Sequence, residues 1–347
     1  MTKSRFNLRN VVKIGVACLA VCMMFSGCKD PNDDPKNPDN PDNPGGNGSG
    51  LSAWTKVTSP LPSDFQCIAF GDGKFVAGSE NSMVAISSDN GKTWTTKKIT
   101  EKNHRINSII YANGKFVAIG GGSKVFYATN PAEDWTMAVD IEEAFDIRIN
   151  VIYFDGTRYV SGNTAGEMAY STDLVNWTAN TTNVFTTEGY TIYGYASGKG
   201  KLVAVGEEGK IAYADSPGGE WTLVSGNPAG DRNVRAITYA NNTFVAVGSA
   251  VGTSATIIYT DNPASTWTKA SNNVATAAYA IVYGGGYYVL GGSMGGLAYA
   301  TKLDTWTQVS DSKFDSNPIN GIAFGNNTFI AVGGINNNST IAYATIK

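Results

Sequence analysis

The sequence has 347 residues, of which 11% are aromatic and 40 are glycine, and its formal net charge is −3 at pH 7. The aromatic and glycine content is typical of an all-β protein with many tight turns. The weakly acidic charge disfavours nucleic acid or an anionic membrane surface as a partner, because both attract basic proteins.

Residues 1–27 have the pattern of an export signal. Four basic residues precede an apolar run from Ile14 to Phe25, which is too short for a permanent membrane span. The segment Phe25-Ser26-Gly27-Cys28 resembles the lipobox of bacterial lipoproteins. The resemblance implies that residues 1–27 are removed, that Cys28 is lipidated, and that the protein is anchored to the cell envelope, at the outer membrane. The alternative is an ordinary signal peptide that contains a cysteine.

Residues 28–50 predict a disordered tether. After Cys28 they consist mainly of proline, asparagine, aspartate and glycine, so they have no apolar side chains to bury. The acidic start of this segment resembles the surface-export signal of Bacteroidetes lipoproteins, which implies surface exposure. It is also the composition of a plain solvated linker.

Residues 51–347 contain one unit repeated seven times. Seven tryptophans, each followed by threonine, lie 39 to 46 residues apart: Trp54, Trp94, Trp135, Trp177, Trp221, Trp267 and Trp306. A second motif, with a large apolar anchor, also occurs seven times, at Phe75, Phe116, Tyr159, Leu202, Phe244, Tyr288 and Phe329. Each repeat predicts four short antiparallel strands, which is the pattern of a propeller blade.

The fifth repeat illustrates the pattern. It predicts strands at 235–239, 243–248, 256–260 and 267–270, and Asn241-Asn242 is a favoured hairpin turn between the first two. No helical periodicity interrupts the repeats.

The two ends of the repeat region complete each other. The seventh repeat stops after its third strand, whereas the strand of Trp54 precedes the first full repeat. We therefore predict that the N-terminal strand completes the last blade, which closes the ring and removes exposed sheet edges. The predicted fold is all-β, a seven-bladed β-propeller over residues 51–347. Six or eight blades would require that one of the motifs be ignored.

The first repeat contains a complete S-x-D-x-G-x-T-W motif, formed by Ser87, Asp89, Gly91, Thr93 and Trp94. This motif resembles the Asp-box of BNR-repeat propellers. The resemblance implies that the motif is a turn between the third and fourth strands, that Asp89 holds its backbone, and that Trp94 packs between blades. Five other repeats keep degraded copies, which end at Trp135, Trp177, Trp221, Trp267 and Trp306. Asp-box propellers occur in sialidases, other glycan hydrolases, sortilin-type receptors and photosystem assembly factors, so the motif indicates fold and not function.

Candidate ligand-binding residues lie at the start of each innermost strand. Nine residues before each anchor lie Gln66, Asn107, Asn150, Arg235, Tyr279 and Asn320, with Thr191 expected in the fourth blade. Two residues earlier, on the same side of each strand, lie Asp64, Arg105, Arg148, Asn233, Ala277 and Pro318. These residues predict a polar ring at the channel mouth with arginines from blades two, three and five. Arginine forks bind carboxylates, which suggests an anion or glycan site. The ring is alternatively a channel lining without a ligand.

The sequence predicts a monomeric, ligand-binding propeller that takes a glycan or a protein partner over this ring. Sugar binding would require exposed aromatic rings beside it, and Tyr190, Tyr279 and Tyr287 are the candidates. One alternative is a sialidase-like glycoside hydrolase, which would need three arginines on the substrate carboxylate, a tyrosine nucleophile with a glutamate partner and an acid/base aspartate. Other glycosidases need two nearby carboxylates, such as Asp64 and Glu80. Another is an envelope assembly factor or scaffold.

We expect neither a metal nor a cofactor. The repeat region has a single histidine, His104, and a single cysteine, Cys67, which is expected to be a small buried residue in a strand.

Overall fold

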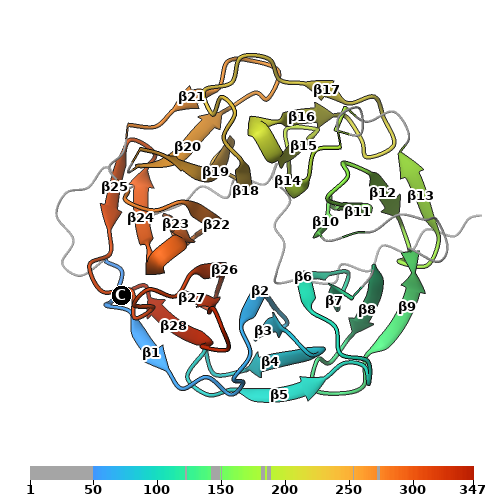
Figure 1. Cartoon of the computed structure of the whole chain (residues 1–347), viewed down its shortest axis with the longest axis vertical. Helices are drawn as coiled ribbons and strands as arrows, with labels where there is room; N and C mark the ends of the chain where they lie inside the picture. Colours follow the sequence, from blue (N-terminus) through green and yellow to red (C-terminus); the bar gives the residue numbers. More distant parts are fainter. Residues whose placement is uncertain are drawn as a thin grey trace, which may run out of the picture. The chain divides into compact units, whose positions relative to one another are not determined.

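A computed structural model describes residues 50–121, 123–141, 149, 151–180, 184–185, 189–252, 254–271 and 274–347. The predicted leader, Cys28 and nearly all of the tether lie outside the described residues. Over the described residues the chain is a seven-bladed β-propeller, in which seven four-stranded antiparallel sheets are arranged around a central axis (Figure 1). The fold class predicted from the repeats is confirmed.

Each blade runs from an innermost to an outermost strand. Blade 1 contains β2 (Phe65–Gly71), β3 (Lys74–Ser79), β4 (Met83–Ser87) and β5 (Thr95–Lys98); blade 2 contains β6 (Ile106–Ala112), β7 (Lys115–Gly120), β8 (Lys124–Ala128) and β9 (Thr136–Asp140); blade 3 contains β10 (Val151–Phe154), β11 (Tyr159–Gly162), β12 (Met168–Ser171) and β13 (Trp177–Asn180); blade 4 contains β14 (Ile192–Gly198), β15 (Lys201–Gly206), β16 (Ile211–Ala214) and β17 (Thr222–Leu223).

Blade 5 contains β18 (Val234–Ala240), β19 (Thr243–Val251), β20 (Ser254–Thr260) and β21 (Thr268–Lys269); blade 6 contains β22 (Ala278–Gly284), β23 (Tyr287–Gly292), β24 (Leu297–Lys302) and β25 (Thr305–Gln308); blade 7 contains β26 (Ile319–Gly325), β27 (Thr328–Gly333), β28 (Thr340–Thr345) and β1 (Thr55–Val57). Two short 3-10 turns, η1 (Glu207–Gly209) and η2 (Ser293–Gly295), lie between the second and third strands of blades 4 and 6.

The fifth blade matches its sequence pattern closely. The second strand, β19, is buried on both faces over its first part, as its nearly continuous apolar sequence predicts. Asn241 and Asn242 form the hairpin with φ of 49° and 58°. These positive values are the conformation that a two-residue hairpin turn requires and that asparagine tolerates well.

The ring is closed as predicted. β1 pairs with β28 in antiparallel register, with Thr55 opposite Tyr343 and Val57 opposite Ile341. A further bridge joins Leu51 to Ile346, and Trp54 is buried in the core between blades 6 and 7. The first strand of the chain thus covers the edge that the last strand would otherwise expose.

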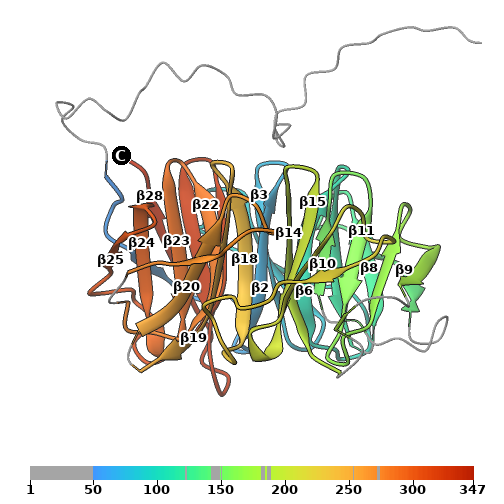
Figure 2. The same cartoon turned by 90° about the horizontal axis from the view of Figure 1, so that it is seen from above.

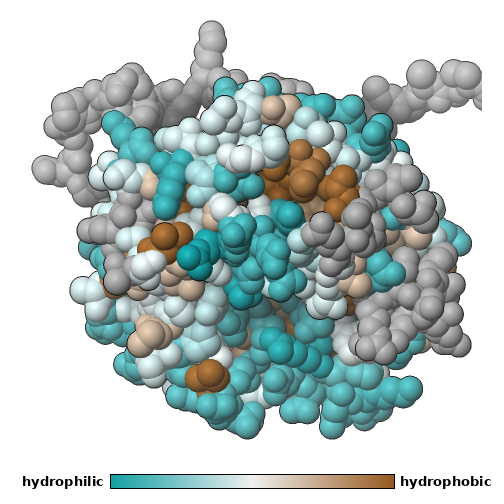
Figure 3. All heavy atoms as spheres, turned by 45° about the horizontal axis from the view of Figure 1, so that its top comes forward, coloured by the Kyte–Doolittle hydropathy of each residue, from teal (hydrophilic) through white to brown (hydrophobic). Residues whose placement is uncertain are grey.

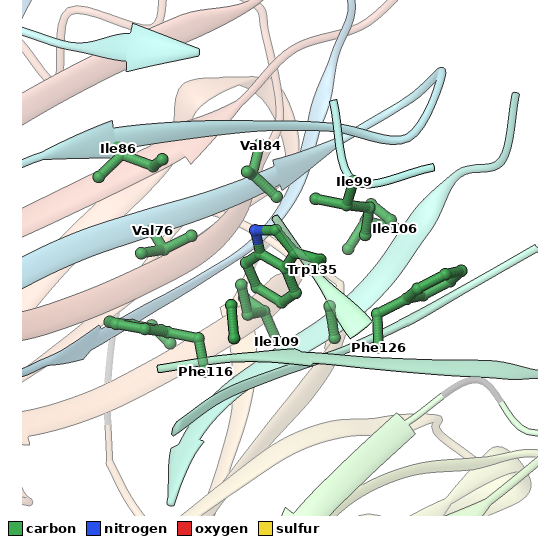
Figure 4. Close-up of a cluster of buried hydrophobic side chains, with 12 residues drawn as sticks. Val76, Val84, Ile86, Ile99, Ile106, Ile109, Phe116, Phe126 and Trp135 are labelled. Atoms are coloured by element: carbon green, nitrogen blue, oxygen red, sulfur yellow. The ribbon is translucent and has the colours of Figure 1, made fainter. Parts of the chain in front are cut away.

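The hydrophobic core lies between blades. Trp135, on the outer part of blade 2, packs against Val76 and Val84 of blade 1 and against Ile109 and Phe116 of its own blade (Figure 4). Six of the seven repeat tryptophans are buried, whereas Trp94 is only partly buried. Trp94 borders a groove of about 500 Å³ on the outer rim, where blade 7 meets blade 1.

The turn at Ser87–Trp94 is held by one carboxylate. Asp89 accepts hydrogen bonds from the Ser87 hydroxyl and from the backbone amides of Lys92 and Thr93, at 2.8, 3.1 and 2.9 Å. The Thr93 hydroxyl donates to the second carboxylate oxygen at 2.6 Å. Partial burial alone would raise the pKa of Asp89, but these hydrogen bonds together lower it to about 2.

A degraded copy of this turn in blade 3 keeps the same bonding. Asp173 accepts hydrogen bonds from Ser171, Val175 and Asn176. Leu174, with φ of 71°, stands where the first repeat has Gly91, with φ of 83°. Leu174 is 2% exposed and packs in the core between blades 2 and 3, so its burial compensates for the strained backbone.

The propeller has two faces (Figure 2). We call the mouth face the one where the innermost strands begin and where the loops between second and third strands lie. The opposite face carries the turns between first and second strands and those between third and fourth strands. Over the described residues, no helix is long and apolar enough to span a membrane.

Candidate functional site

The predicted ring residues lie on β-bulges. In six blades the pairing of the innermost strand with the second strand shifts by one residue near its start, and in five of them the extra residue is the one predicted from the sequence. A bulge re-aims the side chain of the extra residue, so the same deviation recurs around the axis. We call these six partly buried residues the mouth ring: Gln66, Asn107, Tyr193, Arg235, Tyr279 and Asn320.

Three predicted positions need comment. The bulge residue of blade 4 is Tyr193 and not Thr191, since the β14–β15 hairpin has no extra residues. Thr191 is instead buried, and its hydroxyl donates to Glu207 at 2.9 Å. Arg148 and Asn150 of blade 3 lie outside the described residues.

One part of the mouth ring links blades 7, 1 and 2 structurally. The Asn320 amide donates to the carbonyl oxygen of Phe65 at 2.8 Å, which joins blade 7 to blade 1. The Arg105 guanidinium donates to the Gln66 side-chain oxygen, which joins blade 2 to blade 1. These polar side chains have partners within the protein, so this part of the ring is explained by packing alone.

The part of the ring in blades 4, 5 and 6 is different. The Arg235 guanidinium carbon lies 5.0 Å from the ring centre of Tyr193 and 5.4 Å from that of Tyr279. The arginine therefore interacts with an aromatic ring from each neighbouring blade. Cation–π contacts of this kind contribute about 0.5–2 kcal/mol each, depending on burial. Asn233 in turn approaches the Tyr193 hydroxyl at 3.5 Å.

Arg235 has unused hydrogen-bonding capacity. Its Nε is buried and has no hydrogen-bond partner in the structure. Among the described residues, no carboxylate forms an ion pair with this guanidinium. Buried polar groups are nearly always hydrogen-bonded, and a guanidinium is best matched by a carboxylate or another oxyanion.

Over the described residues, the arginines of the expected three-arginine site have different partners. Arg105 is exposed and bonded to blade 1, whereas Arg235 is held by tyrosines of blades 4 and 6. The candidate site is therefore the cluster of Tyr193, Arg235 and Tyr279. The sequence places this position at Thr191 only if two extra residues are assumed in the turn of blade 4. Counting nine residues back from Leu202 without that assumption identifies Tyr193.

Other polar residues of the mouth face shape its loops. Asp64 accepts hydrogen bonds from the backbone amides of Asn337 and Asn338 in blade 7, so its carboxylate caps a loop. Lys124 and Asp140 form an ion pair in blade 2. His104 packs against Gly121, and burial together with the nearby Lys124 lowers its pKa.

Two of the three candidate tyrosines do not flank the site as open rings. Tyr287 follows the turn between β22 and β23, on the face opposite the mouth, and contacts Tyr299 edge-on. The ring of Tyr190 lies 4.6 Å from the Lys210 ammonium. Only Tyr279 belongs to the mouth ring.

Comparisons with known proteins agree with this architecture. Neither a protein-family profile nor a curated protein sequence matches the chain. A solved structure described as YCF48 bound to D1 peptide is similar, with a TM-score of 0.67 at 15% identity, and the match covers 85% of this chain and 97% of that chain. YCF48 from Cyanidioschyzon merolae is similar at 14% identity, with a TM-score of 0.66 and coverage of 85% and 98%.

The computationally designed Ika8 protein is also similar, with a TM-score of 0.56 at 12% identity and coverage of 83% and 98%. At such low identity these similarities bear on the propeller fold alone. Within the described residues, no group of three or more His, Cys, Asp or Glu side chains is arranged to hold a metal ion.

Proposed function

We propose that this chain is a binding propeller of the cell envelope, which captures a protein partner by a carboxylate at Arg235. The observation that carries the proposal is the cluster itself. Tyr193 and Tyr279 hold the guanidinium in one orientation, and its buried Nε has no hydrogen-bond partner. A preorganised arginine of this kind loses little freedom when it binds an oxyanion.

A protein partner fits this geometry better than a glycan does. Sugar binding relies on open aromatic faces, whereas Tyr193 and Tyr279 each direct an aromatic face toward Arg235. The structural similarity to a propeller described as bound to a peptide supports the same choice. A glycoside hydrolase is not favoured by a specific observation, because Asp64, one of its candidate carboxylates, caps a loop.

The envelope location rests on the sequence of the leader. Cys28 in its lipobox-like context would carry the lipid anchor, and residues 29–49 would be the tether. Gly50 accepts a hydrogen bond from the Lys347 amide, and the Ile346 amide donates to Asn327 in a turn of the opposite face. A chain that enters the propeller there leaves the mouth face free for a partner.

Replacement of Cys28 by serine is expected to abolish incorporation of a radiolabelled fatty acid.

The binding proposal is tested with a displayed library of random peptides with free carboxyl termini. The chain from residue 29 onward contains every described blade and is the form to be used. Peptides selected on it are expected to depend on a carboxylate. The Arg235→Ala variant should weaken their binding about tenfold to a hundredfold, the usual value of a charge-assisted hydrogen bond.

The matched control is Arg158→Ala. Arg158 also lies over a tyrosine ring, at 5.7 Å from that of Tyr170, but in a turn of the opposite face. The selected peptides should bind this variant normally. Peptides that bind the Arg235→Ala variant equally well would contradict the proposal, and so would binding to carboxylate-bearing glycans on an array without any peptide binding.

A further inference from the structure

The loops of the mouth face are chemically unequal. In blades 5, 6 and 7 a large apolar side chain is exposed where the second strand connects to the third: Val251 ends β19, Met294 lies in η2 and Ile335 lies in the loop after β27. Val251 is 40% exposed, Met294 is 78% exposed and Ile335 is 51% exposed. Single exposed apolar side chains are common on protein surfaces, but these three lie on the same face and belong to three consecutive blades.

The turn of blade 6 does not require its methionine. Met294 is the central residue of η2, with φ of 54°, and Glu208 occupies the same place in η1 of blade 4, with φ of 49°. Because a glutamate suits this strained turn in blade 4, the fold has no need of an exposed methionine in blade 6. The corresponding loops of blades 1 and 3 have Glu80-Asn81 and Thr164-Ala165.

A pocket of about 480 Å³ adjoins Met294. Its lining is mixed, because Ala275 and Val309 are apolar whereas Gln308 and the paired Lys313 and Asp311 are polar. The pocket is large enough for a side chain of a partner, and Met294 would cover that side chain. Figure 3 shows hydrophobic residues as separate patches on a mostly hydrophilic surface, so the apolar contacts are local anchors rather than one broad face.

We propose that the exposed loops of blades 5, 6 and 7 form a docking surface for an extended protein segment that carries apolar side chains next to a carboxylate. We call the surface of Val251, Met294 and Ile335 the apolar rim. Aliphatic and thioether side chains favour a protein segment over a sugar, which prefers aromatic rings. Arg235 belongs to blade 5 on the same face and supplies the charge that complements the carboxylate. This inference rests on the proposed function only for that carboxylate contact.

The test measures the same selected peptides against variants of the apolar rim. The double variant Met294→Glu and Ile335→Asn introduces polar residues that related loops of this chain already carry, so the fold is expected to persist. Binding of the wild-type-selected peptides should fall at least tenfold, with an unchanged preference for a carboxylate. The matched control is Met137→Glu with Val175→Asn, since both residues are about half exposed but lie away from the mouth-face loops.

The outcomes separate the two proposals. If the apolar-rim variant binds the peptides as tightly as the wild type while Arg235→Ala does not, the docking surface is wrong and the carboxylate site stands. If only the apolar-rim variant loses binding, the docking surface stands and the carboxylate site is wrong. If sedimentation shows that the wild type is a dimer and the apolar-rim variant is a monomer, the occupant is a second copy and the docking proposal is overturned.

Discussion

At the scale of single residues, the environment of a side chain decides its chemistry more than its type does. Arg105 and Arg235 occupy neighbouring positions of the repeat, yet Arg105 bonds to Gln66 while Arg235 is flanked by two tyrosines. The first arginine is satisfied by the protein itself. The second retains hydrogen-bonding capacity, and for that reason the candidate site is assigned to blades 4–6.

The surroundings of Cys67 also decide its chemistry, but they make its thiol less reactive. Burial raises the pKa of its thiol to about 12, although the Gly78 amide and the charge of Arg105 act to lower it. At pH 8 only about one thiol in ten thousand is then ionised, and the thiolate is the reactive form. We predict that Cys67 does not react with Ellman's reagent in the folded chain from residue 29 onward, where it is the only cysteine. It should react within minutes in denaturant, and rapid labelling of the native protein would contradict the raised pKa.

At the scale of elements, one carboxylate stabilises the turn between β4 and β5. The Asp89 carboxylate accepts hydrogen bonds from two backbone amides of the turn, much as a capping residue does at a helix N-terminus. The Asp89→Ala variant should lose about 1 kcal/mol of unfolding free energy, measured by urea denaturation. The control is Asp134→Ala, because Asp134 is 98% exposed and its ion pair with Lys97 is a surface contact.

The contribution of Asp89 should also depend on pH. Its folded pKa of about 2 is lower than the ordinary value of 3.8, so folding favours the ionised form. A carboxylate of this kind stabilises the fold fully above the unfolded pKa, and the effect disappears as the pH falls through the folded pKa. The stability difference between wild type and Asp89→Ala should be constant above about pH 5 and shrink from there toward pH 2. A difference that grows on acidification would contradict this assignment.

At the scale of the whole molecule, stability depends on a closed ring. β1 is only three residues long, but it covers β28, and Trp54 just before it is buried in the core between blades 6 and 7. A chain that begins at residue 59 should unfold at a markedly lower temperature and associate through the uncovered edge of β28. Loss of a buried tryptophan side chain alone costs about 3–5 kcal/mol.

The matched comparison is a chain that begins at residue 50. It lacks the tether but keeps β1, so its unfolding temperature should equal that of the longer chain. Calorimetry and size-exclusion chromatography measure both effects. If the chain from residue 59 unfolds like the chain from residue 50, ring closure by β1 is not needed for stability.

The sequence by itself determined the architecture. Each repeat carries its own hairpin turns, apolar anchor and tryptophan, such as Asn241-Asn242, Phe244 and Trp267 in blade 5. These signals are local, because a blade is one supersecondary unit, so their number gives the number of blades. The missing last strand and the extra first one predict the closure for the same reason.

Only the tertiary structure decided the character of the mouth ring. Sequence counting placed Arg235, Tyr279 and Asn320 at equivalent positions, but the partners of each come from neighbouring blades. Residues about forty positions apart meet there, each from the bulge of its own innermost strand. Whether a polar side chain is satisfied or left with free donors depends on those contacts between blades, and no repeat motif encodes them.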